Sequence, residues 1–434
     1  MADSFAFLFN VWGVIIVLFS IMGLRNNRWK ISVITIINLF YSIIYGFAPA
    51  SLCSYAYGHS QLSYFDINFS NEQSILLFLL SSVVVFFFIN VGYNFKFKVK
   101  PIQYNLSTVK IRKSAFILMV VGLVSLYLWT KAYGGPIGIL PYANALRAGR
   151  DVGINNPWSF MMKLCPFMQF AAYLFFSQYL TNRKKVDLFL FIISSIGTSF
   201  FILANSSRMH FALFFLILAL LYQGHRKMSW RSYLLFGGLA VVSVYIMHIA
   251  ESIMNVFQTN ADFENDAAFS ITEVLREEFF FPLLSFQTYL DHSVSFRIFE
   301  DIANSIYAWL PTSFKPVSLE RLEVTNTILA SGSMDHGGLP TDFVTTCLYE
   351  LNVFGLLVIP VLFGMLAKFF EAKIHPLVNF DLYKVVYYLG CFYFLKAVGY
   401  GDPANIMTNI FFLVWGYVFI IIFSKNNRRY VSAR

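Results

Sequence analysis

The sequence has little charge and is rich in apolar side chains. Only 13% of its 434 residues are Asp, Glu, Lys or Arg, whereas 58% are hydrophobic and the mean hydropathy is +0.62. A water-soluble protein cannot bury so large an apolar fraction, so soluble, disordered and nucleic-acid-binding classes are excluded. The composition therefore predicts an all-α polytopic membrane protein.

Cysteine is scarce, and so are the short motifs of nucleotide and metal chemistry. The four cysteines (Cys53, Cys165, Cys347 and Cys391) show no CxxC spacing, which argues against a zinc site or a disulfide framework and favours apolar filling. The chain also has no GxSxG, no P-loop and no DxD-like pair. We therefore expect no cofactor, no metal and no nucleotide substrate.

Long apolar runs are the main feature of the sequence. About 20 apolar residues span the hydrocarbon core of a bilayer as a helix, and about eleven runs approach that length. Their approximate extents are 4–24, 31–52, 73–95, 114–130, 158–180, 186–204, 209–224, 232–250, 345–367, 385–400 and 406–424.

Basic residues gather in every second loop between these runs. The resulting cytoplasmic segments hold 22 basic and three acidic residues, whereas the outer side holds ten basic and 20 acidic residues. Lys and Arg collect in cytoplasmic loops, so the pattern predicts a periplasmic N-terminus, a cytoplasmic C-terminus and an odd number of spans. We expect a multi-pass protein of the bacterial inner membrane.

The loops on the outer side divide the chain into three parts. Residues 1–250 hold helices 1–8 with a shorter periplasmic loop at 131–157. Residues 251–345 form a large periplasmic loop, and 346–434 hold helices 9–11 and the tail. A loop of this length is too long for a passive connector. Its helical stretch, 271–290, is expected to lie along the membrane surface or to cap a cavity.

The ten basic residues left on the outer side are the candidates for binding an anion. They are Lys131, Arg147, Arg150, Lys163, Arg208, Arg276, Arg297, Lys315, Arg321 and Lys396. A charge in the hydrocarbon costs roughly 2.5 to 3.5 kcal/mol at a helix centre unless it is compensated.

Arg208, in a short turn between two spans, is the strongest candidate, with a snorkelling arginine as the alternative. Arg147 and Arg150 lie three residues apart and would share a helical face towards a diphosphate, or pair with Asp151 or Asp66.

The remaining basic residues have competing structural explanations. Arg276 lies beside acidic neighbours, and Arg297 is followed by Glu300 and Asp301 at helical spacing, so intrahelical ion pairs compete with diphosphate binding. Lys163 and Lys396 lie about five residues inside their spans, where snorkelling to the interface is the simpler explanation.

The densest polar stretch is 331–342, directly before the ninth span. Asp335, His336, Asp342 and, one or two turns later, Glu350 are candidate catalytic groups, because a buried carboxylate or a histidine can accept a proton from a hydroxyl. A helix N-cap at Thr341 or Asp342 explains part of the pattern without chemistry. Glu350 requires a partner in any case, because it lies inside a spanning helix.

Three short motifs carry a resemblance. They are Asn205-Ser-Ser-Arg208, Gly337-Gly-Leu-Pro-Thr341, and Glu350 with Gly355 in Tyr-Glu-Leu-Asn-Val-Phe-Gly. With eleven helices and one large late outer loop, the chain resembles the Wzy-type O-antigen and capsular repeat-unit polymerases.

The resemblance implies a GT-C-like architecture and polymerisation of undecaprenyl-diphosphate-linked repeat units at the periplasmic face. It gives Arg208, Arg147, Arg150, Arg276 and Arg297 to the diphosphates. In the mechanism it suggests, His336 is the base, and Asp335, Asp342 or Glu350 orients or replaces it. A chain-length regulator and a flippase are the implied partners.

Three alternatives stay open from the sequence. An O-antigen ligase has a similar architecture and the same donor, but transfers it to lipid A core. A lipid-linked oligosaccharide flippase also needs cationic cavities, although it is expected to carry charges through the middle of several helices and to have short outer loops. A sensory or interaction protein predicts that the loop charges are individually dispensable.

Overall fold

The computed structural model describes most of the chain. The described residues are 2–26, 31–56, 67–69, 71–100, 104, 106–147, 152–205, 208–225, 276, 278–292, 296–298, 300–307, 309, 320–334 and 338–425. Within them, every regular element is a helix, apart from an isolated bridge between Leu106 and Lys425. This confirms the predicted all-helical class.

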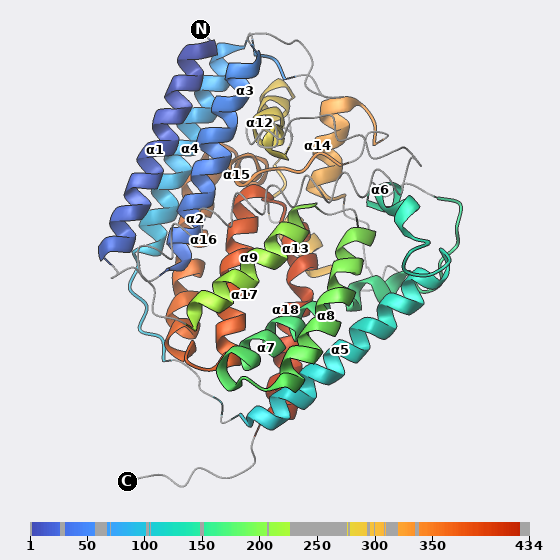
Figure 1. Cartoon of the computed structure of the whole chain (residues 1–434). Coiled ribbons are helices and arrows are strands. Elements are labelled where there is room, and N and C mark those ends of the chain that lie inside the picture. The colour runs from blue at the N-terminus through green and yellow to red at the C-terminus, as the bar shows by residue number, and fades with distance from the viewer. Residues whose placement is uncertain are drawn as a thin grey trace.

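The helices of the N-terminal half form two groups, one of α1 to α4 and one of α5 to α9, and α17 (Asp381–Gly399) of the C-terminal half contacts both (Figure 1). In chain order they are α1 (Ala2–Asn26), α2 (Val33–Ser42), the π-helix η1 (Ile43–Phe47), α3 (Ala48–Ala56), α4 (Glu72–Tyr93), α5 (Thr108–Lys131), η2 (Leu140–Tyr142), α6 (Ala143–Arg147), η3 (Ser159–Leu164), α7 (Pro166–Asn182), α8 (Lys185–Ala204) and α9 (Arg208–Gly224).

The C-terminal half alternates short helices with long ones. Its elements are α12 (Phe281–Asp291), α13 (Glu300–Tyr307), α14 (Leu322–Ser331), α15 (Phe343–Leu351), η5 (Asn352–Phe354), α16 (Gly355–Ile374), η6 (His375–Leu377), α17 (Asp381–Gly399) and α18 (Pro403–Ser424).

Eight helical stretches are long and apolar enough to cross a membrane. They are Asp3–Arg25, Val33–Tyr55, Glu72–Tyr93, Thr108–Lys131, Ser159–Asn182, Lys185–Ala204, Phe343–Leu377 and Pro403–Ser424. Each overlaps one of the predicted spans, so the multi-pass membrane class is confirmed. The predicted runs 209–224 and 385–400 correspond to α9 and α17, which fall outside this set of eight, and the run 232–250 lies outside the described residues.

Helix ends that the sequence places on one side meet in the structure. The start of α5 meets the start of α8 through an ion pair of Arg112 with Asp187. Ser107 N, at the same start, donates to Ser424 O at the end of α18 (3.2 Å). His225, at the end of α9, lies 3.4 Å from Asp381 at the start of α17. We call this face the basic end, and the opposite face, which bears α12, α14 and residues 338–342, the loop end.

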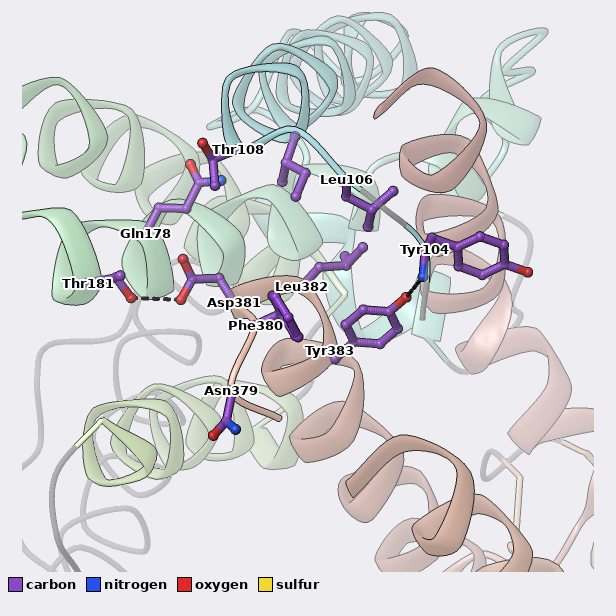
Figure 2. A pocket seen from close by; sticks show the side chains of 11 residues that line it. Tyr104, Leu106, Thr108, Gln178, Thr181, Asn379, Phe380, Asp381, Leu382 and Tyr383 are labelled. Carbon is purple, nitrogen blue, oxygen red and sulfur yellow. Dashed lines mark hydrogen bonds between the residues drawn. The ribbon is translucent and has the colours of Figure 1, made fainter. Parts of the chain in front are cut away.

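A cavity of about 430 Å³ opens at the basic end (Figure 2). It lies where α5 and α17 begin and α7 ends, and its lining combines apolar, aromatic and hydrogen-bonding side chains. The lining residues are Tyr104, Leu106, Thr108, Ile111, Gln178, Thr181, Asn379, Phe380, Asp381, Leu382 and Tyr383. None of the residues predicted for catalysis or diphosphate binding belongs to it.

The predicted span 345–367 is a broken helix. The short helix α15, whose residues from Phe343 to Glu350 are all buried, ends at Asn352 with a φ of 53°, and α16 resumes at Gly355 after one 3-10 turn. Gly355 packs against the carbonyl of Cys347 so closely that a Cβ would overlap it. The break lies at the surface, where Val353 and Phe354 are exposed, and after it α16 packs along α4.

The span 31–52 is interrupted as well, by the π-helix η1. A π-turn adds one residue to a helical turn and often marks a functional position. Gly46 of η1 lies against Gly13 of α1, so the two helices approach at backbone distance. Beside this turn, Tyr41 and Tyr45 are fully buried in the core, and the centroids of their rings lie 4.2 Å apart.

Part of the large outer loop is buried in the fold. In α12, Pro282 occupies the first turn, where its missing N–H is harmless, and the residues from Phe281 to Thr288 are all buried. The helix contacts α4, α14 and α15. For these residues the first expectation, a position on the membrane surface, is wrong, because Leu283 and Phe286 join the main core and Phe281 and Leu284 pack with Leu339. The other expectation, that the stretch caps a cavity, stays a prediction.

The packing of α4 on α16 generates a stability prediction. A Cβ on Gly364 would overlap the carbonyl of Ile89, whereas nothing lies within 4 Å of one on Gly23. We expect Gly364→Ala to destabilise the chain by about 1–3 kcal/mol, because the helices must separate. Thermal unfolding followed by gel filtration in detergent measures the effect, with Gly23→Ala as control. Equal melting temperatures for the two variants would contradict this packing.

Candidate functional site

Residues 338–342 form a non-helical segment at the loop end, in which Leu339, Thr341 and Asp342 are buried. Leu339 N donates to Thr327 Oγ1 (2.7 Å), and Asn326 Nδ2 donates to Leu339 O (3.1 Å). Ser285 Oγ donates to Pro340 O (3.0 Å). Side chains of α12 and α14 thus satisfy backbone groups that no helix can satisfy here. The described end of the polar stretch singled out in the sequence, residues 338–342, is thus bonded to two short helices.

Asp342 ends this segment and begins α15. Its Oδ2 accepts hydrogen bonds from Val344 N (3.0 Å), Thr345 N (3.3 Å) and the hydroxyl of Tyr45 (2.7 Å). This confirms the predicted helix N-cap. Asp342 is fully buried, and burial raises its pKa to about 6, although the hydrogen bonds oppose the shift. The π-helix and the broken span therefore meet at one carboxyl group.

The turn between α17 and α18 packs onto the same segment. Gly401 N donates to Thr341 O (2.8 Å), and a Cβ on Gly401 would overlap Thr346 Oγ1 and the carbonyl of Asp342. Only glycine fits this contact, which brings Asp402 to the same region.

Asp402 is the N-cap of α18 and is itself buried. Its Oδ1 accepts from Ala404 N (2.8 Å), whereas Oδ2 has no hydrogen bond among the described residues. Burial raises the pKa of Asp402 to about 6; Asp301 and Glu323 also raise it electrostatically, and Arg321 lowers it. A carboxyl with a free oxygen and such a pKa is suited to exchanging a proton near neutral pH.

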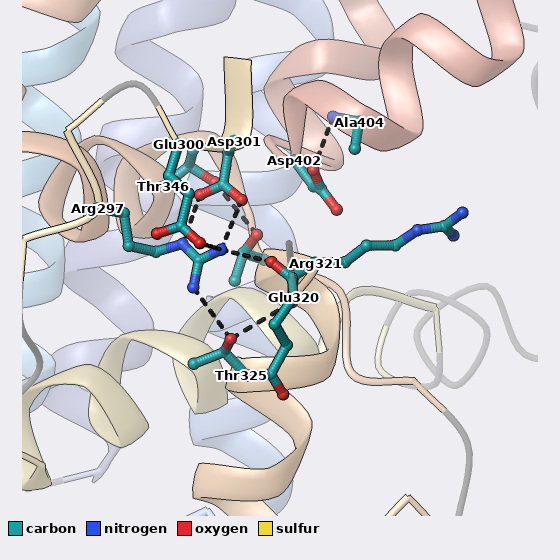
Figure 3. A network of polar contacts seen from close by, with 10 residues as sticks. Arg297, Glu300, Asp301, Glu320, Arg321, Thr325, Thr346, Asp402 and Ala404 are labelled. Atoms are coloured by element: carbon teal, nitrogen blue, oxygen red, sulfur yellow. Dashed lines mark hydrogen bonds and ion pairs between the residues drawn. The ribbon is translucent and has the colours of Figure 1, made fainter. Parts of the chain in front are cut away.

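Arg297 forms the predicted ion pair rather than a free cationic site (Figure 3). Its Nε and Nη2 donate to the two carboxylate oxygens of Asp301 (2.7 and 2.9 Å). Nη1 donates to Thr325 Oγ1 (3.1 Å), and Nη2 also donates to Glu320 O (2.6 Å). Burial alone would lower the pKa of Arg297, but the bonds and charges of Asp301 and the charge of Glu300 raise it overall. All three guanidinium nitrogens are thus engaged.

Glu350 lies within the electrostatic reach of the same guanidinium. It is buried in α15, and its charge acts on Arg297, whose backbone N donates to the neighbouring Tyr349 O (3.2 Å). A carboxylate inside a spanning helix was predicted to need a partner, and Arg297 supplies the opposite charge.

Lys396 is buried inside the bundle, so the expectation that it snorkels to the interface is wrong. It is only 4% exposed, because α17 is covered along nearly its whole length. Its ammonium lies 3.1 Å from Nε2 of His210 on α9 and 5.8 Å from the ring centroid of Tyr400. Glu323 attracts it electrostatically, but Lys396 has no ion pair among the described residues.

His210 is the partner that sequence reasoning missed. It stands two residues after Arg208, at the start of a predicted span. That position was the available signal, because a polar side chain in the first turn of a span must find a partner in the protein. The structure shows that the partner is Lys396, which is remote in the sequence.

The other predicted residues are placed only in part. Arg276 stacks its guanidinium over the ring of Tyr55, 3.8 Å from its centroid. Of its predicted partners Glu273, Glu277 and Glu278, the first two lie outside the described residues. Arg147 ends α6 and Arg208 begins α9, but their side chains are not described. Arg150, Asp335 and His336 lie outside the described residues.

Within the described part of the chain, no cluster of three or more His, Cys, Asp or Glu side chains is suited to a metal ion, and the four cysteines are free and buried. No family model, curated protein or solved structure matches the chain. Fold and site together define a helical multi-pass membrane protein with a buried polar cluster at its loop end.

The raised pKa of Asp402 predicts a pH-dependent stability. A carboxyl in an unfolded chain has a pKa of about 3.9, so the folded state holds its proton to higher pH. Its contribution to stability is therefore complete below about pH 4 and is lost as the pH rises through about 6.

Asp402→Asn stays neutral and keeps an N-cap oxygen. Between pH 4 and 7 the wild-type chain should lose up to about 3 kcal/mol of folding stability through Asp402, and we expect the variant not to lose it. Its melting temperature should therefore change less with pH over this range. The exposed Asp291→Asn is the control, and an unchanged slope in Asp402→Asn would refute the assignment.

Proposed function

We propose that the chain is a membrane glycosyltransferase that polymerises undecaprenyl-diphosphate-linked oligosaccharide repeat units, of the O-antigen or capsule type, at the outer face of the bacterial inner membrane. The type of reaction is inferred from the resemblance of the three short motifs to those of Wzy-type polymerases. The support from the structure is a polar cluster buried among apolar helices at the loop end. In this proposal the loop end faces the periplasm, in line with the basic residues at the opposite end.

One observation carries the proposal, namely the buried ammonium of Lys396. Removing a cation from water costs several kcal/mol unless an anion compensates it. Among the described residues, the ammonium has one hydrogen-bonding partner, a histidine, and no ion pair. A diphosphate is an anion of the right kind to occupy such a position. Arg208 begins the helix that carries His210, so we assign the diphosphate to Lys396 and Arg208 together.

The reaction is a displacement at the anomeric carbon of the donor glycan. The bond between this carbon and the diphosphate oxygen breaks, and undecaprenyl diphosphate leaves with the bonding electron pair. A hydroxyl oxygen of the non-reducing sugar on the acceptor repeat unit forms the new bond and loses its proton to a base. Cations near the leaving group stabilise its developing charge.

The base is assigned to His336, two residues before the segment 338–342. In this scheme Asp342 positions the segment through its N-cap, and Asp335 and Glu350 orient the histidine. Arg147 and Arg150 hold the second lipid diphosphate. Arg276 and Arg297 take positioning roles, since Arg276 stacks on Tyr55 and Arg297 binds Asp301 in the structure.

A deletion strain separates the proposal from its rivals. Loss of a polymerase collapses the surface polysaccharide ladder to a single repeat. Loss of a ligase instead leaves polymer that is not attached to lipid A core, and loss of a flippase leaves lipid-linked repeat units on the cytoplasmic side. A gel of the surface polysaccharide, with extraction of the lipid-linked intermediates, distinguishes these results.

Complementation of that strain with point variants tests the site. We expect Lys396→Met and Arg208→Ala each to lower polymer formation by about 100-fold, because each removes a charge that stabilises the leaving group. Lys396→Arg should restore part of the activity. The exposed Lys131→Met, at the same end of the bundle, is the control and should keep the full ladder.

The amount of each variant in the membrane and its gel-filtration profile show whether it folds. A normal ladder from Lys396→Met would refute the assignment of the diphosphate to this lysine.

A further inference from the structure

The cavity at the basic end has the features of a ligand site separate from the loop end. It is bounded by the first turns of α5 and α17 and the last turn of α7 (Figure 2), so it lies at the level where these helices end. A cavity at this level opens where a lipid headgroup meets its acyl chains. Leu106, Ile111 and Leu382 give it an apolar side.

Gln178 points to a ligand that forms hydrogen bonds. Its side chain is 2% exposed and lies beside Thr108 in the lining. Among the described residues its Oε1 has no hydrogen-bonding partner. Leaving a buried amide without partners costs about 1–3 kcal/mol, and a ligand in the cavity would remove that cost.

Two helix N-termini at the cavity lack side-chain caps. The N-cap of α5 is Ser107 and that of α17 is Phe380, and neither side chain bonds to the first turn of its helix. The first N–H groups of a helix attract anionic oxygens. Thr108, the first residue of α5, adds a hydroxyl donor. This side of the cavity is suited to a phosphodiester.

The opposite charge is provided by Asp381. The lining has no other carboxylate and contains no lysine, arginine or histidine. Its Oδ1 accepts from Thr181 Oγ1 (2.7 Å) and Ser177 Oγ (3.1 Å) and lies 3.4 Å from His225 Nε2, whereas no described residue donates to Oδ2. A carboxylate with a free oxygen binds a ligand ammonium better than it binds a second anion.

We propose that this cavity binds the headgroup of a zwitterionic aminophospholipid of the membrane. The ammonium of the phosphoethanolamine group bonds to Asp381, its phosphodiester lies at the start of α5 with Gln178 and Thr108, and the acyl chains leave along Leu106 and Ile111. A choline headgroup has no N–H to donate, and an anionic glycerol headgroup places no positive charge on Asp381. The cavity therefore selects ethanolamine lipids.

Binding to the delipidated, purified full chain tests this inference. Short-chain phosphatidylethanolamine, phosphatidylcholine and phosphatidylglycerol are titrated separately, and the melting temperature is recorded. We expect phosphatidylethanolamine to stabilise the chain at concentrations about tenfold lower than the other two, as the loss of one charge-assisted bond implies. Free phosphoethanolamine, which lacks acyl chains, should have no effect at the same concentrations.

Variants assign the effect to the cavity. Asp381→Asn should abolish the preference for ethanolamine over choline. Because Asp381 also holds Ser177 and Thr181, Gln178→Leu is the second variant and should weaken all phospholipids. Gln169→Leu is its control on α7, where Gln169 bonds to Tyr173 instead. Equal stabilisation by the three lipids, full binding in Gln178→Leu, or an equal effect of free phosphoethanolamine would overturn the proposal.

Discussion

Backbone polar groups inside a membrane protein must be satisfied by the protein itself, and this constraint determines the structure of the loop end. A bilayer offers no water to unpaired backbone groups, so spanning segments are helical wherever they can be. The segment from Gly338 to Asp342 is not helical, and it exists only because Ser285, Asn326 and Thr327 bond to its backbone. The short helices α12 and α14 are therefore needed for the site to form.

Asp342 connects this segment to distant parts of the chain. Its Oδ2 accepts a hydrogen bond from the hydroxyl of Tyr45, a residue of the π-helix. The same oxygen accepts from Val344 N and so caps the start of α15. Gly401 packs on the same residues and fixes the turn that holds Asp402. The π-helix of one interrupted span and the first turn of α15, where the other begins, thus meet at one buried carboxyl.

The charges at the loop end differ in how well they are compensated. Arg297 is fully engaged by Asp301, Thr325 and Glu320 O, and Glu350 adds a nearby negative charge. Among the described residues, Lys396 has one partner at hydrogen-bonding distance, His210. Arg297 therefore has a structural role, whereas Lys396 is suited to binding an anionic ligand. The main candidate for anion binding is thus a lysine inside a helix and not one of the arginines in the loops.

Hydropathy and loop charge predicted most of the spans, because length and apolar composition are local properties of the sequence. The N-cap at Asp342 and the pair of Arg297 with Asp301 were also predictable, since both partners lie within a few residues. The break at Asn352, the π-helix and the bond of Lys396 to His210 were not. Each depends on contacts between helices remote in sequence, such as that of Gly46 with Gly13. From the sequence alone, a lysine near a helix end is compatible both with snorkelling to the interface and with burial among other helices.

The most direct test of the central claim uses the purified chain in lipid nanodiscs with undecaprenyl-diphosphate-linked repeat units as the only added substrate. Gel electrophoresis of the extracted glycans should show chains of two or more repeats and release of undecaprenyl diphosphate, both absent with Lys396→Met. Persistence of single repeats alone, from a folded chain that binds the lipid-linked substrate, would contradict the account.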